Sequence, residues 1–375
     1  MNIPMVDLQG QYKHLKAEID TEIQKVLNTS SYINGPAVQE FARDMETYLG
    51  VKHVIPCANG TDALQVAMMG LGLKPGDEVI TTSFTFIATA EVIALLGLTP
   101  VLVDVLEDTM NIDPQAIKNA ITDKTKAIVP VHLFGQTANM DEIMTIAKEN
   151  DLFVIEDNAQ AIGANYTFVD GSTKKAGTIG DVGCTSFFPS KNLGAYGDGG
   201  AIFTNNDDLA EQLKVIVNHG MKVRYYHDYV GVNSRLDSIQ AAVLKVKLPH
   251  LDEFAKARNF AANYYNTAFA DCEKISTPVT ADFTDHVYHQ YTMKLHGVDR
   301  DALQKHLSEK GIANAVYYPV PLHMQSAYKD ERYKPGDFPV TEKLSAEVMS
   351  LPMHTEFTVE QLKYVTDAVL EFINK

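Results

Sequence analysis

Apolar residues recur every three or four positions through the first fifty residues of the chain. This spacing puts them on one face of a helix and is typical of amphipathic helices. The first set is Tyr12, Leu15, Ile19, Ile23 and Val26. The second set is Val38, Phe41, Met45 and Tyr48. We therefore expect the chain to open with two helices.

From there to about residue 203, short β-rich runs alternate with helical patterns. The runs that we predict as strands are His53–Cys57, Glu78–Thr82, Pro100–Asp104, Ala127–Val131, Leu152–Glu156, Val182–Phe187 and Ala201–Thr204. The helices that we predict between them include Asp62–Leu71, Ala88–Leu96 and Met140–Glu149. Such alternation predicts an α/β fold with a mostly parallel sheet buried on both faces. Ligands of these sheets bind beyond the carboxyl ends of the strands.

The last third of the chain has a different pattern. Apolar residues from Leu251 to Ala268 predict one long helix. After it we predict a strand at Tyr288–Leu295, a helix at Asp301–Glu309, a strand at Ile312–Tyr317 and a closing helix at Val359–Ile373. These elements predict a large domain over residues 1–250 and a small α+β domain over residues 251–375.

Composition narrows the function classes. The 375 residues are 45% hydrophobic and 21% charged, which is typical of a globular protein of about two domains. Lys and Arg number 32 against 48 Asp and Glu, and the net charge of −16 argues against a general nucleic-acid or anionic-membrane binder. Three cysteines are too few for a disulfide framework or a thiolate zinc site. The sequence begins without a secretory signal pattern, and we expect a cytoplasmic protein.

The most informative chemistry surrounds Lys191. This lysine lies in Phe187-Phe188-Pro189-Ser190-Lys191, shortly before Gly197-Asp198-Gly199-Gly200, and not on a charged helical face. A desolvated lysine has a lowered pKa and more free amine, as Schiff-base chemistry requires. The competing interpretation is an ordinary surface lysine in a loop.

Asp157 follows the apolar run that ends at Glu156. A carboxylate at the end of a buried strand can simply cap a turn or a helix. Beside an activated lysine it suggests a partner for the ring nitrogen of pyridoxal phosphate, because a carboxylate keeps that nitrogen protonated.

The turn Asn59-Gly60-Thr61-Asp62-Ala63 lies between a predicted strand and a predicted helix. Its glycine allows close backbone approach, and the helix N-terminus with the Thr61 hydroxyl would suit a phosphate. Thr61 as a plain helix N-cap explains the same residues.

Other motifs are weak. His286-x-x-His289 could hold a metal, but no Cys or carboxylate pattern supports one, and we interpret both residues as strand histidines. We predict no metal site.

The ordered segments together resemble the DegT/StrS-type sugar aminotransferases, which are pyridoxal-phosphate enzymes acting on keto nucleotide sugars. The matching segments are Ala58–Leu64, Gly76–Ile80, Glu156-Asp157, Ser186–Lys191, Gly197–Gly200 and Val232–Asp237. The resemblance covers essentially the whole chain. It implies an aspartate-aminotransferase-like fold (pyridoxal-phosphate fold type I) with a large seven-stranded, mostly parallel sheet domain, a small C-terminal domain and a homodimer with shared active sites.

The resemblance also assigns cofactor roles. Lys191 would bond to pyridoxal phosphate and then act as the general base and acid. Asp157 would hold the ring nitrogen, and Gln160 the phenolic oxygen. Phe84 would stack on the ring. The residues that would bind the phosphate are Gly60, Thr61, Ser186 and, from the partner subunit, Asn233.

For the substrate, the resemblance implies contacts from Ser30, Tyr32, Ser190 and Arg235. The pattern is most similar to enzymes that aminate UDP-2-acetamido-2-deoxy-3-oxo-glucuronate with L-glutamate, in bacterial surface polysaccharide (lipopolysaccharide) biosynthesis. The Arg235 guanidinium suits a carboxylate, although an ion pair with Asp237 or another acid would also explain it. Where close relatives have His-Tyr-Pro, this chain has Tyr317-Tyr318-Pro319, and both tyrosines are candidate substrate contacts.

Three rival functions remain. The first is an aminotransferase for a different dTDP- or UDP-linked keto-deoxysugar. The second is a pyridoxal-phosphate sugar dehydratase of the same fold, in which relatives replace the lysine by histidine. The third is a sensor that has kept the fold without the chemistry. Lys191 argues against the dehydratase, and Lys191 together with Asp157 and Gln160 argues against the sensor.

Overall fold

Two helices open the chain, as predicted. The computed structural model describes residues 1–374, and in it α1 spans Leu8–Thr29 and α2 spans Pro36–Leu49. Asp7 caps α1 by accepting a hydrogen bond from the backbone of Gly10, and Pro36 occupies the first turn of α2. Both helices bury the residues that define their apolar faces, among them Ile19 and Phe41.

A seven-stranded sheet forms the centre of the molecule. Its strand order is β1-β9-β8-β5-β4-β2-β3. The strands are β1 (His53–Cys57), β2 (Glu78–Thr82), β3 (Thr99–Val103), β4 (Thr125–Val129), β5 (Phe153–Asp157), β8 (Val182–Ser186) and β9 (Gly200–Thr204). Strand β9 is antiparallel to its neighbours β1 and β8, while the remaining pairs are parallel. The predicted mostly parallel sheet is confirmed, with all seven runs in it.

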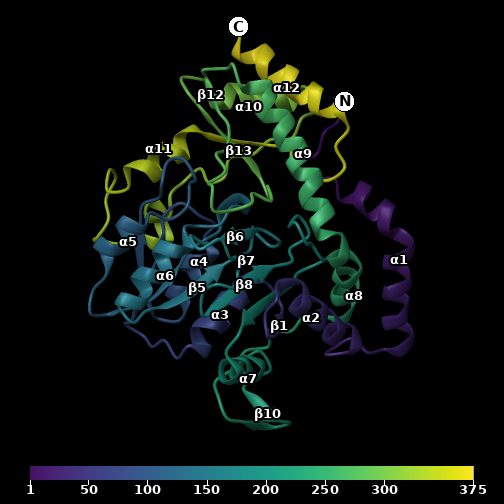
Figure 1. Cartoon of the computed structure of the whole chain (residues 1–375), viewed down its shortest axis with the longest axis vertical. Coiled ribbons are helices and arrows are strands. Elements are labelled where there is room, and N and C mark those ends of the chain that lie inside the picture. The colour runs from purple at the N-terminus through teal and green to yellow at the C-terminus, as the bar shows by residue number, and fades with distance from the viewer. Residues whose placement is uncertain (375) are drawn as a thin grey trace.

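Helices cover both faces of this sheet (Figure 1). Helices α3 (Gly60–Gly70), α4 (Ala88–Leu95) and α7 (Asp207–Ile216) share one apolar cluster with the sheet. Helices α2, α5 (Pro114–Ala120), α6 (Met140–Glu149) and α8 (Ser238–Lys247) share two others. Alternate strand residues enter different clusters, as Val54 and Ile55 do, so the sheet is buried on both sides.

The C-terminal third builds a smaller sheet with its own core. The sheet contains β12 (Ile275–Ser276), β13 (Tyr291–Leu295) and β14 (Val348–Leu351), all antiparallel. The helices are α9 (Leu251–Phe269), α10 (Arg300–Glu309), α11 (Pro339–Glu347) and α12 (Val359–Ile373). The N-terminal Ile3 bridges to Ile312 and packs into this core, so the start of the chain joins its C-terminal third (Figure 1). The domain boundary near residue 250 stays a prediction.

Two strand predictions in this region need correction. Ile312–Tyr317 is not a strand, because it pairs only at single positions, through Ile312 with Ile3 and through Ala315 with Ser350. The third strand of the small sheet is β14, which was not predicted. Strand β13 begins at Tyr291 and not at Tyr288, where the backbone has a left-handed φ of 44°. His286 and His289 therefore precede the strand and are not strand histidines.

The remaining elements are short. They include the hairpins β6 (Asn165–Thr167) with β7 (Thr173–Lys175) and β10 (Met221–Val223) with β11 (Tyr226–His227). Single 3₁₀ turns occur at Leu133–Gly135, Leu248–His250, Leu322–Met324 and Ser326–Tyr328. Within residues 1–374, every helix is too short or too polar to cross a membrane.

Candidate active site

A cavity of about 650 Å³ lies at the carboxyl ends of the parallel strands. Segments that follow β1, β2, β5 and β8 line it, so residues far apart in the sequence converge there. This is the edge where ligands of such sheets bind. The predicted site residues that line the cavity are Gly60, Thr61, Asp157, Gln160, Ser186, Ser190, Lys191, Tyr317 and Tyr318.

Asp157 is the last residue of β5, and its carboxylate is held in place from two sides. Thr89 Oγ1, in the first turn of α4, donates to Asp157 Oδ2 over 2.8 Å. The backbone amide of Ala159 donates to Oδ1 over 3.1 Å. The Asp157 side chain is 6% exposed and lines the cavity. A buried, oriented carboxylate of this kind is suited to a cationic hydrogen-bond donor.

Lys191 lies in the loop between β8 and β9. The interpretation as an ordinary surface lysine is wrong, because the side chain is partly buried and lines the cavity. Burial lowers the pKa of Lys191 to about 8, and the nearby Asp157 carboxylate opposes this shift. An amine with this pKa is partly unprotonated near neutral pH and can act as a nucleophile and as a base.

The N-terminus of α3 faces the same cavity. Its cap is Asn59, whose side chain accepts a hydrogen bond from Asp62 N over 2.8 Å, and not Thr61. The backbone amides of Gly60 and Thr61 precede the first hydrogen bonds of the helix and are free for a ligand. Gly60 is required by close packing, since a Cβ there would lie 2.7 Å from Ser186 Cβ. These free helix amides, with the hydroxyls of Thr61 and Ser186 in the cavity lining, suit an anionic ligand.

Gln160 and Tyr318 close another wall of the cavity. Gln160 Oε1 accepts from Phe134 N over 2.7 Å, and its Nε2 donates to the Tyr318 hydroxyl over 2.9 Å. These bonds orient the amide, leaving the second hydrogen on Nε2 for a ligand. Burial raises the pKa of the Tyr318 phenol, which therefore stays protonated.

The assignment of Phe84 as the ring-stacking residue is wrong. Phe84 is fully buried and packs edge-on against Phe134 and Tyr318, so no face of its ring reaches the cavity. Phe86, two residues later, lines the cavity and is 57% exposed. The aromatic surface that this segment offers to a ligand is therefore that of Phe86.

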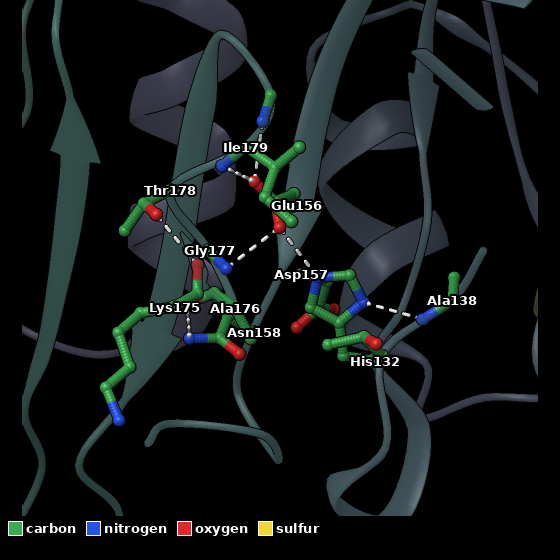
Figure 2. A network of polar contacts seen from close by, with 12 residues as sticks. His132, Ala138, Glu156, Asp157, Asn158, Lys175, Ala176, Gly177, Thr178 and Ile179 are labelled. Atoms are coloured by element: carbon green, nitrogen blue, oxygen red, sulfur yellow. Dashed lines mark hydrogen bonds and ion pairs between the residues drawn. The ribbon is translucent and has the colours of Figure 1, made fainter. Parts of the chain in front are cut away.

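A buried pair of side chains supports Asp157 from behind (Figure 2). Glu156 accepts hydrogen bonds from the amides of Gly177, Ile179 and Gly180. His132 Nε2 lies 2.8 Å from Glu156 Oε2, and its Nδ1 accepts from Ala138 N, so the proton is on Nε2. These contacts hold the pKa of Glu156 below its usual range despite complete burial.

The pair of His132 and Glu156 was not singled out from the sequence. Glu156 precedes Asp157 in the strand and points to the opposite side, into the loop of residues 176–180 (Figure 2). The backbone amide of His132 also donates to Asp157 O over 3.0 Å. The network therefore fixes the end of β5 that carries Asp157.

Besides Phe84, four predicted residues lie outside this cavity. Ser30, Tyr32, Asn233 and Arg235 are on two segments that run side by side, where Ile33 bridges to Asp237 and Ser238 N donates to Tyr32 O. Arg235 forms no ion pair with any residue between 1 and 374, so the ion pair with Asp237 is not formed. None of these four residues lines the cavity that holds Lys191 of the same chain.

Among the lining residues that were not predicted as site residues are Phe86, His289 and Gln290. His289 and Gln290 reach it from the C-terminal third of the chain, just before β13. The only sequence signal was the His286-x-x-His289 pair, which was considered for metal binding. Within residues 1–374, no group of three His, Cys, Asp or Glu side chains could hold a metal ion.

Comparison with known proteins agrees with this geometry. Residues 13–370 match the DegT/DnrJ/EryC1/StrS aminotransferase family. A "Pleiotropic regulatory protein" of Geobacillus stearothermophilus is 48% identical over 99% of both chains. The UDP-2-acetamido-2-deoxy-3-oxo-D-glucuronate aminotransferase of Pseudomonas aeruginosa is 46% identical over 98% of this chain and 99% of its own.

The structural match is equally extensive. The crystal structure of S. venezuelae DesV in complex with a ketimine intermediate has a TM-score of 0.95 and 40% identity. The match covers 100% of this chain and 99% of that one. The fold is pyridoxal-phosphate fold type I, as the resemblance implied. The chain belongs to the DegT/DnrJ/EryC1/StrS aminotransferase family and is a sugar aminotransferase.

Proposed function

We propose that this protein binds pyridoxal phosphate and transfers an amino group from L-glutamate to a keto nucleotide sugar. The leading substrate is UDP-2-acetamido-2-deoxy-3-oxo-glucuronate. The observation that carries the proposal is one cavity holding both Lys191, with its pKa lowered to about 8, and the oriented carboxylate of Asp157.

The residues of the cavity fit the cofactor. The Gly60 and Thr61 amides, with the Thr61 and Ser186 hydroxyls, suit its phosphate. Asp157 suits the protonated ring nitrogen, Gln160 Nε2 the phenolic oxygen, and Phe86 a ring face. When bound, pyridoxal phosphate supplies an electron sink for a carbanion at the substrate carbon.

Lys191 supplies both the attachment point and the mobile proton. Its lowered pKa leaves a useful fraction of free amine at neutral pH. Once released, the same Nζ is in the cavity and can take a proton from one carbon and return it to another, as a general base and then acid. The hydroxyl groups of Tyr318, which stays protonated, and Ser190 lie in the cavity wall and can donate hydrogen bonds to the substrate.

We further propose that the site is completed by the partner subunit of a homodimer. Asn233 is exposed and lies outside the cavity, which supports its predicted reach to the partner's phosphate site. Arg235 has no acidic partner within residues 1–374 and is available for the uronate carboxylate. Ser30 and Tyr32 lie on the adjoining segment and would join Arg235 in binding the sugar nucleotide.

The cofactor proposal is tested by the colour of the purified protein. Incubation with pyridoxal phosphate should give a yellow protein that L-glutamate bleaches. Borohydride reduction and peptide mass spectrometry should find the cofactor on Lys191. The matched comparison within the same digest is Lys247, another buried lysine whose pKa burial lowers to about 8. Attachment to Lys247, or a colourless protein, contradicts the proposal.

The substrate is tested in reverse with a panel of amino nucleotide sugars that includes UDP-linked amino-uronates and neutral dTDP-linked amino-deoxysugars. The expected result is restored colour with the UDP-linked amino-uronate. Arg235→Ala should impair that reaction far more than the reaction of a neutral sugar. Equal impairment would mean that Arg235 does not bind the carboxylate, and a preference for a dTDP-sugar would replace the leading substrate.

A further inference from the structure

His289 is a buried histidine that the proposed chemistry does not use. Its side chain is 7% exposed and lines the cavity that holds Lys191. Its Nδ1 is buried and has no hydrogen-bond partner within the described residues 1–374. A buried, unpaired Nδ1 restricts any contact between this ring and a ligand to its other nitrogen, Nε2.

The backbone around His289 is clamped by Arg258 of helix α9. Arg258 Nη1 donates to the carbonyls of Tyr288, His289 and Met353, over 3.0, 3.2 and 3.1 Å. The arginine is 3% exposed and has no carboxylate partner among residues 1–374. A buried guanidinium held only by carbonyls keeps its positive charge uncompensated next to the cavity wall.

Charge and burial keep the imidazole neutral. Burial, together with the positive charges of Lys191 and Arg258, holds the pKa of His289 well below its usual range. A buried N–H without an acceptor is rarer than an unpaired acceptor, so the proton belongs on Nε2 and not on Nδ1. His289 then offers one N–H donor to a ligand in the cavity.

Gln290 adds a second group of the same kind. It also lines the cavity, and its Oε1 is buried without a partner among residues 1–374. Its backbone amide donates to Phe134 O, which fixes the segment against the wall that holds Gln160. Because Oε1 is buried, we assign the Nε2 end of the amide to the ligand.

His289 and Gln290 would each offer an N–H donor, and the positive charges of Lys191 and Arg258 lie nearby. Together these groups favour an anion. Resting on the proposed function, we infer that His289 and Gln290 form a subsite for the α-carboxylate of the amino donor. That carboxylate is attached to the carbon whose proton Lys191 moves, so it must lie close to Lys191. The keto sugar has no carboxylate at the corresponding position, and the subsite therefore serves one half-reaction and not the other.

The experiment follows the two half-reactions separately by the absorbance of the bound cofactor. The variants are His289→Leu, which removes the donor, and His289→Gln, which keeps an N–H near the position of Nε2. His289→Leu should raise the apparent Kd for L-glutamate roughly 10- to 100-fold, as expected for loss of one hydrogen bond to a charged group. The maximal rate with L-glutamate and the reaction with the amino sugar should stay near wild type, and His289→Gln should recover much of the affinity.

The matched control is His286→Asn. His286 is similarly buried but does not line this cavity, and its Nδ1 accepts from Tyr288 N, an interaction that asparagine can keep. This variant should bind L-glutamate as wild type does. A second readout needs no turnover: binding of the unreactive dicarboxylate succinate, measured by calorimetry, should weaken in His289→Leu and not in His286→Asn.

The outcomes separate the two proposals. A wild-type protein that takes no pyridoxal phosphate, or does not react with L-glutamate, contradicts the proposed function. A reactive wild type with unchanged glutamate affinity in His289→Leu overturns the subsite alone. Equal losses in both half-reactions also overturn it, because His289 would then support the fold of the cavity and not one substrate.

Discussion

At the scale of single residues, Asp157 receives two hydrogen bonds from its own chain, from Thr89 Oγ1 and Ala159 N. Both fix the plane of the carboxylate while leaving lone pairs for a cation. Thr89 is fully buried and makes no contact with the cavity, so its role toward a ligand can only be indirect. It is a positioning residue for Asp157.

Thr89→Val tests this role, because valine keeps the shape and removes the hydroxyl. We expect the affinity for pyridoxal phosphate to fall roughly tenfold, with Thr89→Ser close to wild type. The control is Thr81→Val, which removes an equally buried hydroxyl that donates to Val129 O over 2.9 Å. Equilibrium titration with the cofactor measures the effect, and equal losses in both valine variants would refute a specific role.

The lowered pKa of Lys191 makes a prediction about pH. Only the free amine reacts with an aldehyde, and its fraction grows as pH rises toward a pKa of about 8. Uptake of pyridoxal phosphate by the cofactor-free protein should therefore speed up about tenfold per pH unit below pH 8 and level off above it. An ordinary lysine would level off more than two units higher.

Replacing Asp157 should shift the same pH profile in a defined direction. Its carboxylate raises the pKa of Lys191, so Asp157→Asn should move the midpoint of that pH profile to lower pH. Stopped-flow absorbance measures the profile in both proteins. A midpoint that moves upward would contradict the assigned electrostatics.

At the scale of elements, helix α3 is placed by its contact with strand β8. Gly60 at the start of the helix lies against Ser186 at the end of the strand, and this contact brings the helix amides to the cavity. This contact requires glycine at position 60. A Cβ there would clash with Ser186 Cβ, which no side-chain rotation can move.

Gly60→Ala should therefore push the helix N-terminus away from Ser186. We expect a loss of about 1–3 kcal/mol in stability from overpacking and a clear loss of cofactor affinity. Gly72→Ala is the matched control, since its φ is +74° with no atom within 4 Å of an added Cβ. It should lose about 1–2 kcal/mol to backbone strain and keep the wild-type affinity. Chemical denaturation and cofactor titration measure the two quantities.

The elements also show what the sequence can and cannot predict. The strands of the large sheet are short apolar runs between helical patterns, and local signals suffice to find them. Strand β14 follows α11 directly and has only four residues, so no turn marks its start. Ile312–Tyr317 carries a strand-like pattern, but only tertiary structure decides that its partners are the single residues Ile3 and Ser350.

The residues of the candidate site also fall into those that local sequence predicts and those that it does not. Lys191, Asp157, Gly60 and Thr61 lie in local motifs after strands, and the structure brings them to one cavity. The choice between Phe84 and Phe86 depends on a bend at residues 83–85, which no local pattern specifies. His289 reaches the cavity from the segment just before β13, in the C-terminal third of the chain, so its position follows from tertiary structure alone.

At the scale of the whole molecule, the net charge of −16 coexists with a cavity for which we propose anionic ligands. Local amides, hydroxyls and Lys191 supply that binding, so the overall charge does not oppose it. The four predicted residues outside the cavity, Ser30, Tyr32, Asn233 and Arg235, are consistent with the proposed sharing of sites between two subunits.

Sharing can be tested by mixing two inactive variants. In Lys191→Ala the lysine is lost, and in Asn233→Asp a negative charge would repel the partner's phosphate. A mixed dimer of the two contains one intact site, so equal amounts that exchange subunits should recover about a quarter of the wild-type activity. Activity after refolding the mixture measures this. No recovery would mean that each chain supplies its own complete site.

The antiparallel strand β9 has a consequence for how the chain is made. Within residues 1–374 it is the only sheet partner of β1, and its Thr204 pairs with His53, about 150 residues earlier in the chain. On the ribosome, both edges of β1 remain unpaired until residue 204 has emerged, and open strand edges invite pairing with other chains. The bridge of Ile3 to Ile312 can form only later, after residue 312 has emerged. Synthesis of this protein therefore passes through a long interval in which its earliest segments need protection from neighbouring nascent chains.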